Sequence, residues 1–270
     1  MSEKIAFIGG GNMASAIIGG LIRQGMRPLQ IMVVEPLADQ RDKLKAELGI
    51  EAFSASNNML TQASVVVWAV KPQTFQEAAL AVRTHTKTAL HLSVAAGIRS
   101  DSIAQWLGSE RVVRSMPNTP ALIGKGITAL FPRAAVTSTD RSSVERVIST
   151  TGEHVWLDKE EQLDAVTALS GSGPAYVFYF IETMVQAGRD MGLSVEQATQ
   201  LAKATFMGAA QLAQASQEPV EVLRQRVTSK GGTTYAAITS MQQDQVDTLF
   251  MRAMHAARRR AKELGDEFGV

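Results

Sequence analysis

The sequence predicts an α/β domain followed by an all-α domain, and three observations support this prediction. Short apolar runs alternate with amphipathic helical stretches through the first 160 of the 270 residues. A glycine-rich turn joins the first of these runs to the first helical stretch. Beyond residue 160 the strand-like runs stop and long helical patterns follow. We therefore expect two domains, residues 1–160 and residues 161–270, as the chain length also suggests.

In the first half, strand and helix patterns follow one another regularly. The run 65–70 is continuous and β-branched, as in a strand that is buried on both faces. One helical stretch places Ile17, Ile18 and Leu21 on a single face, and a charged one ends at Gly49. This alternation predicts a parallel sheet with helices on both sides. The expected strands cover residues 5–8, 31–34, 65–70, 90–94 and 112–113.

The second half is predicted to be helical from residue 160 onward. Its helical patterns are interrupted where glycine or proline would end a helix, at 171–174, 192, 219 and 231–232. The longest apolar run of the chain, Ala175 to Ile181, belongs to one of these helices. Because a bilayer needs ~20 apolar residues to be crossed, we expect no membrane segment.

The composition is that of a globular protein with a full core, because 45% of the residues are apolar and 20% are charged. Lys and Arg number 27, and Asp and Glu number 26. With a net charge of +1, we expect no general affinity for nucleic acid or anionic membranes. The absence of cysteine excludes disulfides and cysteine nucleophiles and fits a reducing cytoplasm. The N-terminal sequence lacks the long apolar core of a secretory signal.

Six consecutive residues, Gly-Gly-Gly-Asn-Met-Ala, match the pattern G-x-G-x-x-G/A between the first strand and the first helix. In that context Gly9 allows a tight turn, Gly11 lets the backbone approach a pyrophosphate, and Ala14 lets the helix pack closely. The helix start at Asn12 and Met13 supplies N–H groups and positive potential for phosphates. The turn predicts a dinucleotide site, the alternative being a glycine-rich turn without a ligand.

Glu35 follows the second expected strand. An acid at this place usually accepts hydrogen bonds from the adenine ribose hydroxyls, which favours NAD, and it repels a 2′-phosphate unless basic groups compensate. Arg41 and Lys43 are near in sequence, but we expect them to lie along the next helix. The alternative is an exposed acid beside Pro36 with no ligand.

A polar loop, Ser-Lys-Gly-Gly-Thr-Thr at 229–234, precedes a helical pattern. Its backbone N–H groups could form a nest for a small carboxylate. The hydroxyls of Ser229, Thr233 and Thr234 do not ionise near neutral pH, so they suit hydrogen bonding and orientation. The break at 169–176 also contains glycine and serine and would allow close approach of a cofactor. The alternative for both segments is an ordinary helix start.

Other chemistries find no support in the sequence. The four histidines form no H-x-x-x-H or H-E pattern and no aspartates cluster, so we expect no metal site. No G-x-S-x-G motif of a serine hydrolase is present. We expect the basic run 258–262 to be a solvated helix end, because cations favour helix C-termini.

Together these segments resemble the pyrroline-5-carboxylate reductase family over nearly the whole chain. The matching segments are 7–13 with the glycine turn, Ala-Val-Lys-Pro at 69–72, Met-Pro-Asn-Thr-Pro-Ala at 116–121, the break 170–176, and 231–234 with its following helix. The last three, in this order, are specific to the family. The resemblance implies a Rossmann domain followed by a helical domain that interleaves with that of a second subunit. It also implies an active site at the dimer interface.

The resemblance further implies roles for individual residues. The cofactor would be NADPH or NADH, the substrate 1-pyrroline-5-carboxylate and the product L-proline. Thr234 looks like the catalytic residue, which hydrogen-bonds the ring nitrogen. The other substrate-binding residues would be Ser229, Gly231, Gly232 and Thr233. The cofactor-binding set would be Gly9, Gly11, Asn12, Met13, Glu35, Ala69, Val70, Lys71, Pro72, Asn118, Thr119 and Pro120.

Two residues depart from the family's pattern. Lys230 stands where members commonly have proline, so the carboxylate loop carries an extra charge and more conformational freedom. Glu35 stands where NADPH-preferring members tend to carry small, polar or basic residues. We therefore expect this chain to use NADH better than typical relatives do.

Two other functions compete with imine reduction. A β-hydroxyacid dehydrogenase shares the layout but needs a lysine in the long helix after the glycine-rich break, and 174–191 contains none. A non-catalytic nucleotide sensor would need the glycine turn but not the loop at 229–234. We favour reduction of the cyclic imine by a homo-oligomer formed through the helical domain, with the run 175–181 at the subunit interface.

Overall fold

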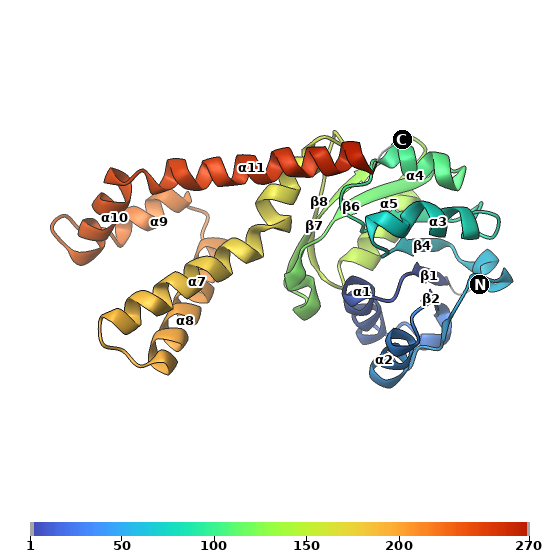
Figure 1. Ribbon diagram of the computed structural model, residues 1–270, viewed down its shortest axis with the longest axis horizontal. Coiled ribbons are helices and arrows are strands. Elements are labelled where there is room, and N and C mark those ends of the chain that lie inside the picture. Colours follow the sequence, from blue (N-terminus) through green and yellow to red (C-terminus); the bar gives the residue numbers. More distant parts are fainter. Residues whose placement is uncertain (1–2, 269–270) are drawn as a thin grey trace. The chain divides into compact units, whose positions relative to one another are not determined.

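The structure is a computed structural model and describes residues 3–268 of the chain. Strands and helices alternate in the first part of the chain, and only helices follow (Figure 1). The strands are β1 (Ile5–Ile8), β2 (Ile31–Val34), β3 (Ala52–Phe53), β4 (Val65–Trp68), β5 (Leu90–Ser93), β6 (Val112–Met116), β7 (Gly126–Pro132) and β8 (Gly152–Trp156). The helices are α1 (Asn12–Arg23), α2 (Ala38–Leu48), α3 (Pro72–Val82), α4 (Ser100–Leu107), α5 (Ser138–Ile148), α6 (Gln162–Val166), α7 (Gly173–Asp190), α8 (Val195–Ala215), α9 (Val220–Arg226), α10 (Thr233–Gln243) and α11 (Val246–Glu267).

The strands form one eight-stranded sheet in the order β3-β2-β1-β4-β5-β6-β7-β8. All neighbouring strands pair in parallel except β6 and β7, which are antiparallel. The expected strands correspond to β1, β2, β4, β5 and the start of β6, but β4 and β5 end before the predicted positions 70 and 94. The sequence pattern did not indicate β3, β7 and β8. The chain turns from β6 to β7 without a crossover helix, and such a connection permits antiparallel pairing only.

Helices cover both faces of the sheet, as the alternation predicted. On one face Ile17 of α1, Leu44 of α2 and Val147 of α5 belong to one apolar cluster with the strands. On the other face Phe75 of α3 and Trp106 of α4 belong to a second cluster. Burying one such side chain stabilises the fold by about 1.5–3 kcal/mol. The sheet is therefore held from both sides, and its strand ends are fixed in place.

The chain divides into two compact units. The first unit contains the sheet, the segment up to Ser172 and the end of α11 from Ala257 onward. The second unit is Gly173–Ala256. The helical domain predicted over 161–270 therefore has two segments that pack with the sheet, α6 and the end of α11. The physical reason is burial, because Leu163 of α6 is 1% exposed. A functional division at residue 160 stays a prediction.

The second unit consists of helices only. Its helices α7 and α8 pack side by side (Figure 1), and Ser194 and Gln197 form a capping box at the start of α8. The two helices approach each other closely at Gly188, where a Cβ atom would lie 2.9 Å from the Cβ of Ala198. Within residues 173–256, which the structure describes throughout, the buried residues are Gly188, Ala198 and Ala202. This unit therefore has no core of large apolar side chains.

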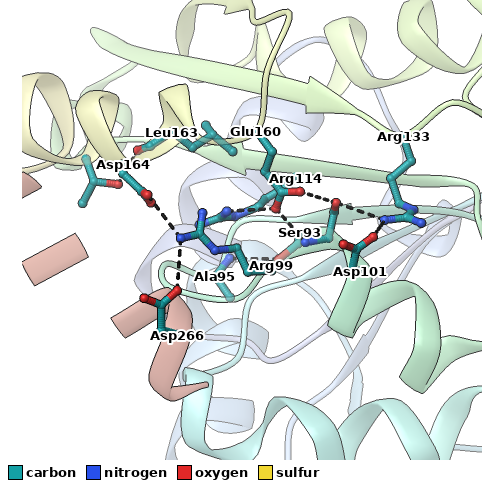
Figure 2. A network of polar contacts seen from close by, with 12 residues as sticks. Ser93, Ala95, Arg99, Asp101, Arg114, Arg133, Glu160, Leu163, Asp164 and Asp266 are labelled. Atoms are coloured by element: carbon teal, nitrogen blue, oxygen red, sulfur yellow. Dashed lines mark hydrogen bonds and ion pairs between the residues drawn. The ribbon is translucent and has the colours of Figure 1, made fainter. Parts of the chain in front are cut away.

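A polar network in the first unit holds α6 and the end of α11 against the sheet (Figure 2). The Nη2 atom of Arg99 lies 3.3 Å from Asp164 of α6 and 3.6 Å from Asp266 of α11. Arg114 of β6 pairs with Glu160 at 2.9 Å, where both side chains are largely buried. Burial lowers the pKa of the Arg114 guanidinium, and the charge of Glu160 opposes this shift. The segment that leaves the first unit and the helix that returns to it thus share one ionic anchor.

Candidate active site

The order of the strands places a topological switch point between β1 and β4. From β1 the chain proceeds to β2 and β3 on one side and then crosses to β4 on the other. In open sheets of this kind, ligands bind at the carboxyl ends of the strands beside the switch point. The glycine turn follows β1, Glu35 follows β2, 69–72 follow β4, and 118–120 follow β6. The structure thus brings the predicted cofactor residues to one edge of the sheet.

Gly9 is required by the fold itself. Its φ of +93° lies in the region that favours glycine. A Cβ atom on Gly9 would lie 2.5 Å from the carbonyl oxygen of Ala69 and 3.1 Å from a methyl group of Val70. Its N–H donates to the carbonyl of Val34 at 2.8 Å. The turn after β1 therefore packs directly on the connection after β4.

Gly11 is not required by the fold. Its φ of −67° suits any residue, and a Cβ atom there would meet no atom of the chain within 4 Å. It caps α1 without a side-chain hydrogen bond, and the first turn holds no acidic residue. The N–H groups at this helix start are therefore open to an anion, and a glycine leaves room for one. These features fit the pyrophosphate of a dinucleotide.

Glu35 shapes the glycine turn, a role that the sequence pattern did not indicate. It is 7% exposed, and its two carboxylate oxygens accept hydrogen bonds from the N–H groups of Gly10 at 2.8 Å and Leu37 at 2.9 Å. Gln40 of α2 donates to the carbonyl of Gly10 at 2.5 Å. Both backbone polar groups of Gly10, its N–H and its carbonyl, are thus hydrogen-bonded to side chains. Because each carboxylate oxygen can accept a second hydrogen bond, the contact of Glu35 with a ribose stays a prediction.

Arg41 lies on α2, as expected, but its side chain reaches back to the end of β2. Its Nη1 atom donates to the carbonyl oxygens of Glu35 at 2.9 Å and Pro36 at 2.6 Å. The side chain bends back because a guanidinium forms strong hydrogen bonds with carbonyl groups that a turn leaves accessible. Lys43, by contrast, is exposed on the helix. The end of β2 therefore carries a positive charge beside Glu35.

The connection after β6 holds Asn118, which caps a short 3-10 turn over Thr119–Ile123. The Asn118 side chain donates to the carbonyl of Ser170 at 3.2 Å and accepts from the N–H of Ile127 at 3.0 Å. It thereby ties the predicted cofactor edge to the break before α7. The members of the cofactor set that are exposed or half-buried at this edge are Gly11, Asn12, Met13, Ala69, Val70, Lys71, Pro72, Asn118, Thr119 and Pro120.

The predicted carboxylate loop lies in the second unit at the start of α10. Gly231 has a φ of +77°, and the N–H of Gly232 donates to the carbonyl of Ser229 at 3.0 Å. Gly232 caps α10 without a side-chain hydrogen bond, so the first N–H groups of this helix are open to a carboxylate. Thr233 and Thr234 are exposed, and within residues 3–268 the Thr234 hydroxyl makes no hydrogen bond.

The predicted site residues therefore form two sets, with the cofactor set in the first unit and the carboxylate loop in the second. Sequence reasoning missed Gln40 as a partner of the glycine turn and the contact of the Arg41 side chain with the end of β2. The only signal for either is its position in the first turn of the helix after β2. In the described part of the chain, no group of three or more His, Asp or Glu side chains could hold a metal ion. No helix there is both long and apolar enough to cross a membrane.

A doubly wound sheet with an open glycine turn at its switch point is typical of dinucleotide-dependent oxidoreductases. A family model described as NADP oxidoreductase, coenzyme F420-dependent, matches residues 4–97. A second model, pyrroline-5-carboxylate reductase dimerisation, matches residues 160–264. The chain belongs to the pyrroline-5-carboxylate reductase family.

Similarity to individual relatives extends over the full length. The chain is 45% identical to a pyrroline-5-carboxylate reductase of Pseudomonas aeruginosa, covering 99% of each protein. A solved pyrroline-5-carboxylate reductase of Coxiella burnetii has a TM-score of 0.90 and 37% identity, over 98% of this chain and 99% of that one. A Plasmodium falciparum pyrroline carboxylate reductase solved with NADP bound has a TM-score of 0.87 and 28% identity, over 98% of each chain. The predicted fold class and family are confirmed.

Proposed function

We propose that this chain reduces 1-pyrroline-5-carboxylate to L-proline with NADPH or NADH, the last step of proline biosynthesis. The observation that carries the proposal is a pair of open helix starts. One lies at Gly11 on the carboxyl edge of the sheet, and the other lies at Gly232 beside the free hydroxyl of Thr234. Full-length relatives named pyrroline-5-carboxylate reductase support the same reaction.

The proposed reduction needs alignment more than acid–base catalysis. A protonated cyclic imine is already a good hydride acceptor, and the bound dinucleotide supplies the hydride. Holding two reactants in the correct geometry can lower a barrier by about 7–11 kcal/mol. A site whose nearest side chains are threonine and serine is therefore chemically adequate. The protein would act mainly by binding the cyclic imine and the dinucleotide and by orienting them relative to each other.

The loop before α10 would bind the substrate. The N–H groups from Gly231 to Thr233 would replace the water around the carboxylate, at a helix end that favours negative charge. The neutral Thr234 hydroxyl would form a hydrogen bond with the ring nitrogen and so fix the face of the imine. Lys230 is an exposed residue of this loop and adds positive charge. The remaining hydroxyls of the loop belong to Ser229 and Thr233.

We also propose that the chain forms a homodimer through the helices of its second unit. The exposed fractions of Val177, Phe178 and Tyr179 on α7 are 40%, 59% and 67%. Apolar surface of this extent is normally covered by a partner. The match to a dimerisation model over residues 160–264 supports a second copy as that partner. A cytoplasmic location is proposed on the absence of cysteine, which fits a reducing compartment.

The test is the oxidation of NADPH and NADH by 1-pyrroline-5-carboxylate, followed by absorbance. For the wild type we expect turnover with the cyclic imine. For Thr234→Ala we expect kcat to fall about tenfold to a hundredfold, because a hydrogen bond to a charged group contributes about 1.5–3 kcal/mol. Thr234→Ser should lose less, because it keeps the hydroxyl.

The matched control is Ser240→Ala, which removes a hydroxyl from an exposed position further along α10. It should keep the wild-type kcat. Unchanged kinetics in Thr234→Ala would overturn the role of that residue. A wild-type chain that oxidises neither coenzyme with the cyclic imine would overturn the proposed reaction.

A further inference from the structure

We propose that Arg41 binds the 2′-phosphate of NADPH and so determines how well this chain accepts that coenzyme. The assignment rests on the proposed reductase function and names the residue that distinguishes its two coenzymes. NADPH differs from NADH by a phosphate monoester on the adenosine ribose. In a sheet of this kind that ribose is bound at the end of the second strand. The residue that recognises the phosphate must therefore lie near the end of β2.

The guanidinium of Arg41 is fixed at this place. Its Nη1 atom donates to two consecutive carbonyl groups, those of Glu35 at 2.9 Å and Pro36 at 2.6 Å. Its backbone N–H donates to the carbonyl of Leu37 at 3.1 Å, and the side chain is half-buried. Because the side chain is already ordered, it loses little conformational entropy when it binds an anion.

The same guanidinium keeps its anion-binding edge open. Nε and Nη2, the pair of nitrogens that forms a bidentate contact with a phosphate, make no hydrogen bond within residues 3–268. Nor does Arg41 form an ion pair with any described residue. Other half-buried arginines of the first unit do have acidic partners: Arg99 pairs with Asp164, Arg111 with Asp140, and Arg133 with Glu110. Arg41 is thus ordered like these arginines but lacks their counter-charge.

The carboxylate of Glu35 does not form an ion pair with the guanidinium of Arg41. Its oxygens accept the N–H groups of Gly10 and Leu37, so its charge is directed into the glycine turn. The start of α2, which has no side-chain cap, adds positive potential at the same place, against the charge of Asp39 in its first turn. Glu35 therefore supports the turn for either dinucleotide, and Arg41 supplies the counter-charge that a 2′-phosphate needs.

The experiment measures binding of ADP-ribose and of its 2′-phosphate to the full-length protein by titration calorimetry. Both probes lack nicotinamide, so no turnover is involved. In Arg41→Ala we expect the dissociation constant of the 2′-phosphate probe to rise at least about tenfold, as for a lost charge-assisted contact. That of ADP-ribose should change less than about twofold. Arg41→Lys, which keeps the charge but not the bidentate fork, should fall between the two.

The matched control is Lys43→Ala, which removes a positive charge from the exposed side of the same helix and should leave both constants unchanged. Arg41→Ala with both constants unchanged, or with both raised equally, would overturn the assignment, because Arg41 would then act only on the loop. A wild type that binds ADP-ribose but rejects its 2′-phosphate also overturns it, yet leaves the proposed reductase function intact with NADH. A wild type that binds neither probe overturns both proposals.

Discussion

The two units of this chain bury apolar residues to very different extents. In the first unit β1, β2 and β4 are buried along their whole length, and Trp68 and Phe75 are fully enclosed. In the second unit, residues 173–256, the buried residues are Gly188, Ala198 and Ala202. The first unit therefore has a core of its own, whereas the second exposes the apolar surface that a core would use.

This difference shows how the two units must be stabilised. Isolated helices draw little stability from local hydrogen bonds, and packing of an apolar face supplies most of it. In the first unit that packing is internal, because helices cover both faces of a sheet. In the second unit the apolar faces of α7 and α8 need a partner, which we propose to be a second copy of the chain. Oligomer formation and folding are then coupled for this unit.

The largest effect is expected from a charge on the exposed apolar face of α7. Phe178→Asp would bury an unpaired carboxylate in the proposed interface, at a cost of at least about 3 kcal/mol. We expect the dimer dissociation constant to rise about a hundredfold or more. Sedimentation velocity would report the loss of dimer, and circular dichroism the accompanying loss of helix. Phe178→Leu should remain dimeric.

The control puts the same charge on the first unit. Leu29 is 89% exposed in the short 3-10 turn Pro28–Gln30, and Leu29→Asp should change neither assembly nor helix content. If Phe178→Asp behaved like Leu29→Asp, the apolar face of α7 would not be an interface. The proposed difference between the units would then be wrong.

Within the first unit, alanine substitutions at two glycines of one turn are expected to have different effects. Gly9→Ala places a methyl group at a positive φ and against the Ala69 carbonyl, so we expect a loss of about 2–4 kcal/mol in the unfolding free energy. Gly11→Ala meets no atom of the chain and should change stability by less than about 0.5 kcal/mol. Its methyl group would instead occupy the space in front of the helix start. Dinucleotide affinity should fall about tenfold or more.

Denaturant unfolding measures the first effect, and fluorescence titration with NADPH measures the second. Equal destabilisation by both substitutions would mean that Gly11 serves the fold rather than a ligand. If Gly11→Ala bound NADPH as tightly as the wild type does, the start of α1 would not be part of the cofactor site.

The sequence was informative where local rules decide the structure. The strands β1 and β2 begin and end where the apolar runs do, and α2 ends at Leu48 with Gly49 as its C-cap, as expected. It was uninformative where contacts between distant segments decide. No pattern placed Gln40 on the Gly10 carbonyl or bent Arg41 back onto the end of β2, because side-chain hydrogen bonds depend on the folded turn. The resemblance to a family indicated which residues form the site, and the structure shows the contacts that hold those at the glycine turn.

The smallest predicted effect concerns the buried core itself. His91 of β5 accepts a hydrogen bond from Trp68 Nε1 on Nδ1 at 3.2 Å. Burial lowers the pKa of His91 to about 4, and the charge of Arg111 acts in the same direction. Between pH 6.5 and about 4 the unfolded chain therefore binds a proton that the folded chain does not. The contribution of neutral His91 to the free energy of unfolding is therefore complete above pH 6.5 and is lost as the pH falls toward 4.

We expect the titration of His91 to lower the free energy of unfolding by about 2 kcal/mol when the pH is lowered from 7.5 to 5. Denaturant unfolding at both pH values and one protein concentration measures the difference. His91→Gln can still accept from Trp68 but cannot titrate, so its stability should fall less between the two pH values, even if it is lower at both. His255→Gln, at an exposed position of the second unit, is the matched control and should keep the wild-type dependence. If both variants retained the full loss, the acid sensitivity of the chain would not arise in the core of its first unit.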